Sequence, residues 1–453
     1  MKQNVKWSLF IIDTLDASDK NNVVLLNTLT TSLVTLDRDF YIAIKSLDPS
    51  LLQEYCKKNG CSYIFDYLCE EEFLLSADVD EEQEYIKSVK CQIQDHDTLA
   101  VHFLPTLGCN FRCPYCYQDG IARTRKMGYS DVDQICDTLN KYLKANPKIR
   151  YLTITLHGGE PTCNWDIVPY AMEQFLTIAT KNNAELRTGI VSNGYLLTPE
   201  KANLLARYNW HRFQVTIDGP QEVHNSRRRM PNGRDTFTPI VDNIKYILDH
   251  DLLHAVDVRI NFDKSNVESI PHLIDYLAEK FDPNRILLSF GYISQTVDGN
   301  ACHEYITDAQ IEYKDFVEAY TKLFLYAYSK GFPFDDCFLF GGLCMSKLRN
   351  SFAFSPDGAV YKCLSMVGRN EGIAGDWKND CDLENIPSLM DYELLHKCFE
   401  EKCPFIPMCN ADCRFDSLIC KGDIKIRNCR RDILMKINRA ILDEKYAKLP
   451  LQD

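Results

Sequence analysis

The residues with the most distinctive chemistry are three cysteines in one short loop, in the stretch LGCNFRCPYCYQ. Cys109, Cys113 and Cys116 are separated by three and then two residues, and the loop offers no fourth ligand. A [4Fe–4S] cluster takes four cysteine thiolates, so three would leave one iron open to another molecule. A structural zinc site would need four ligands and closed tetrahedral geometry. The spacing therefore predicts an iron–sulfur cluster with an open coordination position.

The elements that must position this loop are strands alternating with helices. Apolar strands are expected within residues 99–109, 151–161, 185–194, 212–220, 256–263 and 284–291, with amphipathic helices between them. Right-handed crossover helices make such strands parallel and wind them into a barrel or a doubly wound sheet. Polar and glycine residues gather where these strands end, and parallel α/β folds build their sites at that rim.

The cysteine loop and the strand ends together resemble the radical S-adenosylmethionine (SAM) superfamily. The resemblance implies that the open iron chelates the amino and carboxylate groups of SAM. One electron then breaks a carbon–sulfur bond, and the resulting 5′-deoxyadenosyl radical removes a hydrogen atom from the substrate. It also implies that Tyr115, before the third cysteine, lies beside the adenine.

The remaining SAM contacts are implied by the same resemblance. In HGGEP, Gly158 and Gly159 would let the backbone approach the methionine end of SAM, and Glu160 would meet its ammonium group. Ser192 and Asn193, in SNG, would contact the ribose or the carboxylate. In IDGPQEVHNSRR, Arg227 would pair with the SAM carboxylate, or else be a solvated residue of a basic loop. Asp218 is either a turn former or a polar group near the substrate.

A second field of ten cysteines, between Cys337 and Cys429, resembles the SPASM extension of radical SAM enzymes. That extension implies two auxiliary [4Fe–4S] clusters with interleaved ligands. The expected ligands of the first cluster are Cys344, Cys363 and Cys413, with Cys337 as the candidate for the fourth; those of the second are Cys403, Cys409 and Cys429.

The chain departs from the SPASM pattern three positions before Cys403, where Glu400 stands in place of a cysteine. We favour Cys398 as the substitute ligand, because clusters prefer thiolate to carboxylate. Glu400 as ligand, or an open iron, are the alternatives. Cys381 and Cys420 are expected to be bystanders, although Cys420 could replace Cys429. Structural zinc binding by the whole field is the alternative, and it is disfavoured because the first loop already implies a cluster protein.

Composition supports reduced thiols in a soluble protein. The 453 residues include 20 cysteines, yet no signal peptide and no apolar run of about 18 residues is evident, so a cytoplasmic protein without a membrane partner is expected. The formal charge of −13 argues against a large nucleic-acid surface. Length predicts several domains. We expect a small α+β domain in 1–95, a partial (β/α)6 barrel of the radical SAM type in 96–300, a helical bridge in 301–336 and a cysteine-rich iron–sulfur domain in 337–453, in which RDILMKINRAILDEKY (431–446) forms a closing helix.

The N-terminal 95 residues bear on the substrate. Residues 22–36 suggest two strands around a turn, and helices follow. Small α+β modules of precursor-peptide maturases capture a leader peptide as an added strand; a domain that only buttresses the barrel is the alternative. The resemblance thus implies a peptide-modifying oxidoreductase of ribosomal-peptide biosynthesis that forms a cross-link, with a thioether as the favoured link, and is reduced by flavodoxin or ferredoxin. An anaerobic sulfatase-maturating enzyme, which makes formylglycine, and a non-catalytic electron carrier are the other hypotheses.

Overall fold

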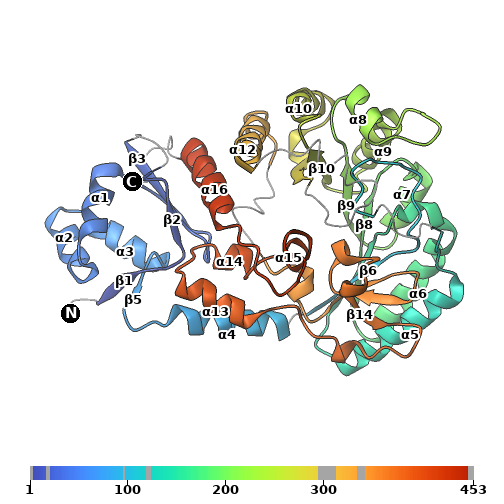
Figure 1. Ribbon diagram of the computed structural model, residues 1–453, viewed down its shortest axis with the longest axis horizontal. Helices are drawn as coiled ribbons and strands as arrows, with labels where there is room; N and C mark the ends of the chain where they lie inside the picture. The colour runs from blue at the N-terminus through green and yellow to red at the C-terminus, as the bar shows by residue number, and fades with distance from the viewer. Residues whose placement is uncertain are drawn as a thin grey trace.

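The computed structural model describes residues 4–16, 21–94, 97–118, 124–293, 313–333 and 342–446. The centre of this described part is a nine-stranded sheet in the order β11-β10-β9-β8-β7-β6-β12-β13-β14 (Figure 1). Its first six strands are parallel neighbours in chain order. They are β6 (Thr98–Phe103), β7 (Tyr151–Leu156), β8 (Glu185–Ser192), β9 (Trp210–Thr216), β10 (Val256–Phe262) and β11 (Ile286–Tyr292).

Helices between these strands cover the outer face of the curved sheet (Figure 1). They are α5 (Tyr129–Ala145), α6 (Val168–Lys181), α7 (Pro199–Ala206), α8 (Gln221–Arg227), α9 (Phe237–Asp249) and α10 (Ile270–Lys280). Along β7, Leu152, Ile154 and Leu156 are fully buried, while the residues between them are only half-buried. This alternation packs apolar side chains under the helices and turns polar ones to the inside. The predicted partial (β/α)6 barrel is confirmed.

The sheet continues past β6 into a part of the chain for which the sequence suggested only cysteine chemistry. Strand β12 (Ser351–Phe354) pairs in parallel with β6, and the antiparallel strands β13 (Ala359–Tyr361) and β14 (Ile373–Asp376) follow. The first segment of the cysteine-rich region is therefore built onto the edge of the barrel sheet, beside the strand that leads into the three-cysteine loop.

The N-terminal unit, which we define as β1 to α4, contains two small antiparallel sheets. One pairs β1 (Val5–Trp7) with β5 (Leu74–Ser76), and the other joins β2 (Ile11–Asp13), β3 (Asn22–Asn27) and β4 (Leu33–Asp37). The helices are α1 (Arg38–Ser46), α2 (Leu52–Lys58), α3 (Ser62–Glu70) and α4 (Glu81–Gln94). The strand pair predicted within residues 22–36 is confirmed as β3 and β4.

The four inner residues of strand β3, Val23–Leu26, are all apolar because both faces of the strand are covered. Val23 and Leu25 belong to a core that the N-terminal unit forms with its own helices, whereas Val24 and Leu26 belong to the large core of the molecule. On that second side lies the C-terminal helix α16 (Arg431–Tyr446), between the small sheet and α12 (Tyr313–Ser329) (Figure 1). The boundary near residue 95 stays a prediction, but the unit is packed against the rest of the chain.

The cysteine-rich region also contains α13 (Tyr392–Glu400), α14 (Ile406–Cys409) and α15 (Arg414–Lys421). Short 3-10 helices lie at Pro49–Leu51, Pro161–Ile167, Val267–Ser269, Pro283–Arg285, Met345–Lys347, Leu364–Met366, Asn370–Gly372 and Leu383–Asn385. Helix α12 falls inside the expected bridge of 301–336, of which 301–312 and 334–336 lie outside the described residues. None of the helices described is both long and apolar enough to cross a bilayer.

Candidate active site and cysteine clusters

The three-cysteine loop leaves the carboxyl end of β6 and is half-buried at the rim of the barrel. Cys109 Sγ accepts a hydrogen bond from the Phe111 N–H at 3.3 Å. Burial and the nearby Glu160 carboxylate raise the pKa of the Cys109 thiol to about 12, and the charges of Cys113 and Cys116 add to this shift. The structure thus brings the three predicted thiols into one neighbourhood. In the described part of the chain, no three His, Cys, Asp or Glu side chains converge tightly enough to hold a single metal ion.

Gly158 and Gly159 pack against the backbone that leads into this loop. A Cβ on Gly158 would lie 2.3 Å from the Thr106 carbonyl oxygen, and a Cβ on Gly159 would lie 2.4 Å from that of Leu107. Gly158 also has a φ of +133°, which side chains disfavour. The Gly159 N–H donates to Thr106 O at 3.1 Å. Whatever SAM contacts they make, these glycines are needed to let the HGGEP turn and the cysteine loop touch.

Glu160 is fully buried and accepts hydrogen bonds from several groups at once. Thr162 donates from its N–H (3.0 Å) and hydroxyl (2.5 Å) and Ser192 donates from its hydroxyl (2.8 Å), all to Oε1, while the Asn193 N–H donates to Oε2 at 2.7 Å. Asn193 Nδ2 in turn lies 2.7 Å from Asn110 Oδ1 and 3.9 Å from Cys109 Sγ. The carboxylate therefore ties the ends of β7 and β8 to the cysteine loop, and the sequence-predicted Glu160, Ser192 and Asn193 form one network.

Arg227 is buried, with 4% of its side chain exposed, so the alternative of a solvated loop residue is wrong. Its Nη1 lies 2.9 Å from both carboxylate oxygens of Asp263, and its Nε lies 3.8 Å from Asp218 Oδ2. The guanidinium also lies 5.0 Å from the centre of the Tyr115 ring. The structure thus brings two of the predicted SAM contacts together around buried carboxylates.

Tyr115 is hydrogen-bonded to Asp218, which the sequence analysis singled out, and to Arg228, which it did not. Its hydroxyl donates to Asp218 Oδ2 and accepts a hydrogen bond from Arg228 Nη1 at 2.9 Å. Burial raises the pKa of Asp218, although Arg228 and Arg227 act in the opposite direction. Arg228 and Asp263 were missed, because nothing local separates Arg228 from its neighbours in the run RRRM or Asp263 from other aspartates that follow strands.

Four cysteines of the second field line one cavity together with Arg427, Arg430 and Asp412. They are Cys398, Cys403, Cys409 and Cys429, and about 330 Å³ of the cavity, open solvent included, is free of protein atoms. Cys398 and Glu400 both belong to α13, but the helix turns Cys398 inward and leaves 64% of the Glu400 side chain exposed, 3.6 Å from His396. This is the thiol set expected with Cys398 as the substitute ligand.

Three of the four ligands expected for the first auxiliary cluster, Cys344, Cys363 and Cys413, lie within the described residues. The charges of Cys413 and Cys344 contribute, after burial, to raising the pKa of Cys363 to about 12, so these three thiols are near one another. Cys337 lies outside the described residues. Cys420 is exposed, and neither it nor Cys381, which adjoins Gly375 in the β13–β14 hairpin, lines the four-cysteine cavity.

Comparison with known proteins shows what the barrel part of the chain resembles. Residues 103–277 match the radical SAM superfamily. The radical SAM cyclopropyl synthase TigE of Paramaledivibacter caminithermalis is 22% identical over 287 residues, 57% of this chain and 58% of TigE. A cysteine-type anaerobic sulfatase-maturating enzyme of Clostridium novyi is 23% identical over 325 residues, 68% of this chain and 85% of that enzyme.

Two solved structures share the fold. One is native anSMEcpe with bound AdoMet and the Kp18Cys peptide, with a TM-score of 0.60 and 18% identity, covering 76% of this chain and 96% of anSMEcpe. The other is Streptococcus suis SuiB bound to S-adenosylmethionine, with a TM-score of 0.52 and 16% identity, covering 94% of this chain and 99% of SuiB. The radical SAM family binds a [4Fe–4S] cluster and SAM, which confirms that cofactor prediction. The chain therefore contains a radical SAM domain, in residues 103–277, and is similar in sequence to a radical SAM cyclopropyl synthase and to an anaerobic sulfatase-maturating enzyme.

Proposed function

We propose that this protein is a radical SAM maturase that captures a ribosomally made precursor peptide and joins a cysteine sulfur to a carbon of that peptide in a thioether link. The observation that supports capture of a peptide is a groove on the N-terminal unit, away from the barrel rim, that has the features of a peptide-binding edge; the thioether link rests on the resemblance to SPASM enzymes alone. The fold likeness to SuiB extends over 94% of the chain and so includes most of the N-terminal unit, whereas the likeness to anSMEcpe covers 76% of the chain.

The residues at the barrel rim fit the family's cofactors. Cys109, Cys113 and Cys116 would supply three thiolates to a [4Fe–4S] cluster, and the candidate contacts for SAM are Tyr115, Gly158, Gly159, Glu160, Ser192, Asn193 and Arg227. When bound, the cluster and SAM supply the one-electron chemistry that begins hydrogen abstraction from the peptide. The chain's own part is to hold the loop with the Glu160 network and to keep Tyr115 between Asp218, Arg227 and Arg228.

We assign the four-cysteine cavity to an auxiliary [4Fe–4S] cluster. Cys398, Cys403, Cys409 and Cys429 match the four thiolates that such a cluster takes. Cys344, Cys363 and Cys413 would hold the other auxiliary cluster, with Cys337 as the fourth ligand. Because Arg427 Nη1 lies 3.5 Å from Cys398 Sγ and Arg430 also lines the cavity, cationic groups are in place to stabilise a thiolate-rich site.

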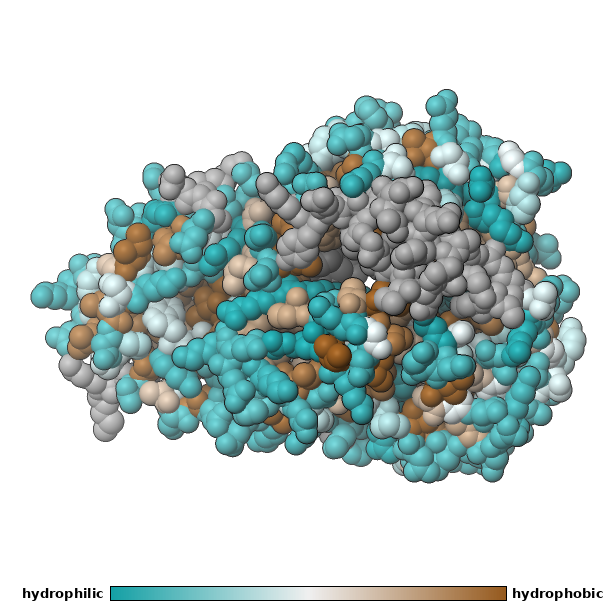
Figure 2. All heavy atoms as spheres, viewed as in Figure 1, coloured by the Kyte–Doolittle hydropathy of each residue, from teal (hydrophilic) through white to brown (hydrophobic). Residues whose placement is uncertain are grey.

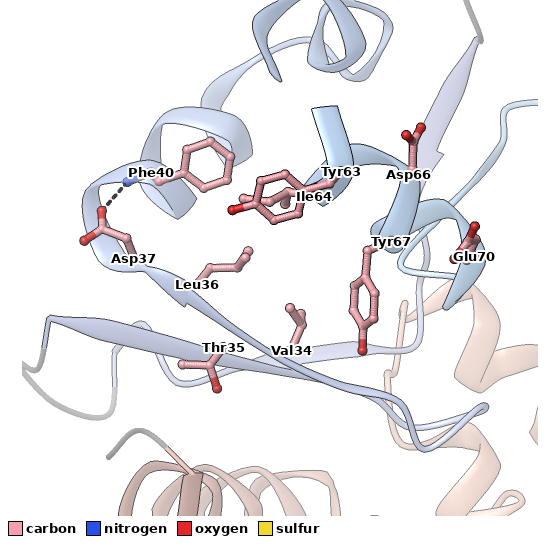
Figure 3. A pocket seen from close by; sticks show the side chains of 10 residues that line it. All are labelled: Val34, Thr35, Leu36, Asp37, Phe40, Tyr63, Ile64, Asp66, Tyr67 and Glu70. Carbon is pink, nitrogen blue, oxygen red and sulfur yellow. Dashed lines mark hydrogen bonds between the residues drawn. The ribbon is translucent and has the colours of Figure 1, made fainter. Parts of the chain in front are cut away.

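The groove lies between the edge strand β4 and helix α3 (Figure 3). Val34, Leu36, Phe40, Tyr63, Ile64 and Tyr67 point into it. Asp37, Asp66 and Glu70 also line it, so an apolar floor has an acidic rim. Figure 2 shows hydrophobic residues at the surface of the N-terminal unit in several places, and 59% of Tyr63 is exposed. An extended peptide with apolar side chains and a basic residue would complement this surface.

The backbone of β4 is suited to pair with such a peptide. In the described residues β4 has β3 on one side and no strand on the other. Asn27 N–H donates to Ser32 O, and Arg38 N–H donates to Asn21 O. These two bonds fix the pattern of the ladder. Because hydrogen-bonded pairs alternate along antiparallel strands, the backbone N–H and C=O groups of the even-numbered residues of β4 point toward β3. The N–H and C=O of Thr35 therefore point outward, where a leader could add a strand.

A proline at this position tests strand addition. Pro is tolerated at an outward-facing edge position but removes the N–H. We expect Thr35→Pro to weaken binding of the precursor peptide by about tenfold, the effect of roughly 1.4 kcal/mol, while SAM cleavage without peptide is unchanged. Thr35→Val keeps the N–H and is the matched control. Equal peptide binding by both variants would contradict capture at this edge and favour a buttressing role.

The mass of the product tests the chemistry. A thioether link removes one hydrogen from sulfur and one from carbon, so the peptide loses two hydrogens. The carbon hydrogen would leave as an atom to the 5′-deoxyadenosyl radical, the thiol hydrogen as a proton, and the surplus electron would pass to an auxiliary cluster. Formylglycine made from cysteine also exchanges sulfur for oxygen, and this outcome would instead support the sulfatase-maturating function, which the relative from Clostridium novyi favours. The absence of SAM cleavage by the reduced protein would leave only the electron-carrier hypothesis.

A further inference from the structure

The loop that joins Cys409 to Cys413 has an unusual backbone. Its three residues Asn410, Ala411 and Asp412 all have positive φ, at 51°, 62° and 90°, and none is a glycine. Side chains disfavour this region of conformational space, and such residues persist where the surrounding structure holds them. The question is which groups hold the loop.

Lys347 holds the loop from the barrel side. Only 3% of this residue is exposed, and Nζ donates to the carbonyls of Cys409 (3.1 Å), Asn410 and Asp412 (2.7 Å). Lys347 lies three residues after Cys344, a candidate ligand of the other cluster. One buried ammonium group thus fixes the carbonyls that the left-handed turn brings together.

Tyr85 holds the same loop from the N-terminal unit. This residue of α4 is buried, and its hydroxyl donates to Asn410 Oδ1 at 2.5 Å. Asn410 Nδ2 then donates to Pro407 O at 3.0 Å. The Tyr85 ring packs on Phe10 and Phe399, with ring centres 5.7 and 5.9 Å apart.

The loop is also tied to the segment before Cys429. Asp412 Oδ2 accepts hydrogen bonds from the Ser417 hydroxyl at 2.9 Å and from the Asn428 N–H. A movement of the loop would therefore displace three of the candidate ligands, Cys409, Cys413 and Cys429.

We propose that Tyr85 and Lys347 are positioning residues that hold the Cys409–Cys413 loop in its left-handed conformation and so place the thiols of both auxiliary clusters. This inference rests on the cluster ligands assigned under the proposed function. Because Tyr85 belongs to the N-terminal unit, its hydroxyl couples the proposed peptide-capturing unit to the auxiliary cluster sites.

The test uses Tyr85→Phe, which removes only the donor. Tyr142→Phe is the matched control, since Tyr142 is also buried and donates to an asparagine oxygen, Asn350 Oδ1, at 2.6 Å. Both changes are made in the full chain carrying alanine at Cys109, Cys113 and Cys116, so that only auxiliary clusters contribute to the spectra. Iron content, the electron paramagnetic resonance spectrum, midpoint potentials and the rate of iron loss to a chelator are measured.

We expect Tyr85→Phe to alter the resonance spectrum or midpoint potential of an auxiliary cluster and to speed iron loss by about five- to tenfold, as expected for one lost hydrogen bond. Tyr142→Phe should change neither. Lys347→Met should produce the same spectral change or lose iron outright. A Tyr85→Phe variant with unchanged spectra, potentials and iron loss would overturn the positioning role. A parent protein without auxiliary iron would overturn the ligand assignment, and this inference with it.

Discussion

Replacing Gly159 with alanine should displace the three-cysteine loop. The added Cβ would lie 2.4 Å from Leu107 O and 2.5 Å from Gly108 O, and ordinary contacts begin near 3.4 Å. Both obstacles are backbone atoms, and Gly108 directly precedes Cys109. No side chain can rotate away to relieve the clash, so the backbone of the loop must move.

The size of the effect follows from the shortfall in distance. The loop and the HGGEP turn must separate by about 1 Å, the difference between the 3.4 Å and 2.4 Å contacts. Overpacking of this kind costs about 1–3 kcal/mol. A misplacement of about 1 Å at a reacting centre can lower a rate about 100-fold, which corresponds to roughly 2.7 kcal/mol of activation free energy.

The assay is the rate of 5′-deoxyadenosine release from SAM by the reduced protein, with iron content and melting temperature measured alongside. Gly128→Ala is the control, because a Cβ there would lie 4.0 Å from its nearest neighbour, Asp131 Oδ2, at an ordinary negative φ. We expect Gly159→Ala to fold and to lose about two orders of magnitude in rate, with Gly128→Ala close to the parent. A Gly159→Ala protein as fast as the control would refute the claim that this glycine sets the position of the cysteines.

Two further predictions concern the cysteine field and the N-terminal unit. Cys398→Ala should lower iron content and change the auxiliary cluster spectrum, whereas Glu400→Gln, at an exposed position, should leave both as they are; the reverse result would restore Glu400 as the ligand. Burial would raise the pKa of Asp13, but the hydrogen bond and charge of Lys45, together with hydrogen bonds from Tyr41 and the Leu15 N–H, lower it below its ordinary value of 3.8. Because the folded-state pKa is depressed, the carboxylate stabilises the fold above its unfolded pKa near 3.9, and this contribution is lost as the pH falls through the folded value. Asp13→Asn should thus cost about 1–2 kcal/mol in the free energy of unfolding at pH 7 and less below pH ~4, measured by denaturant titration; a constant difference between pH 7 and pH 3 would contradict it.

Local features of the molecule were determined by the sequence alone. The three cysteines and their spacing, the six strands of the barrel in order, and the closing helix at Arg431–Tyr446 all follow from patterns within a few residues. Hydrophobic periodicity and ligand spacing are properties of neighbouring residues, so they can be recognised without a structure.

Contacts between distant segments were decided only by the tertiary structure. Nothing in the sequence indicates that β12 pairs with β6, that Arg227 is buried between Asp218 and Asp263, or that Tyr85 reaches Asn410. Which of Cys398 and Glu400 faces the four-cysteine cavity also needed the structure, because the direction of a side chain on α13 depends on what the helix packs against. Long-range pairing and burial depend on how whole elements meet in space, and local periodicity carries no information about those partners.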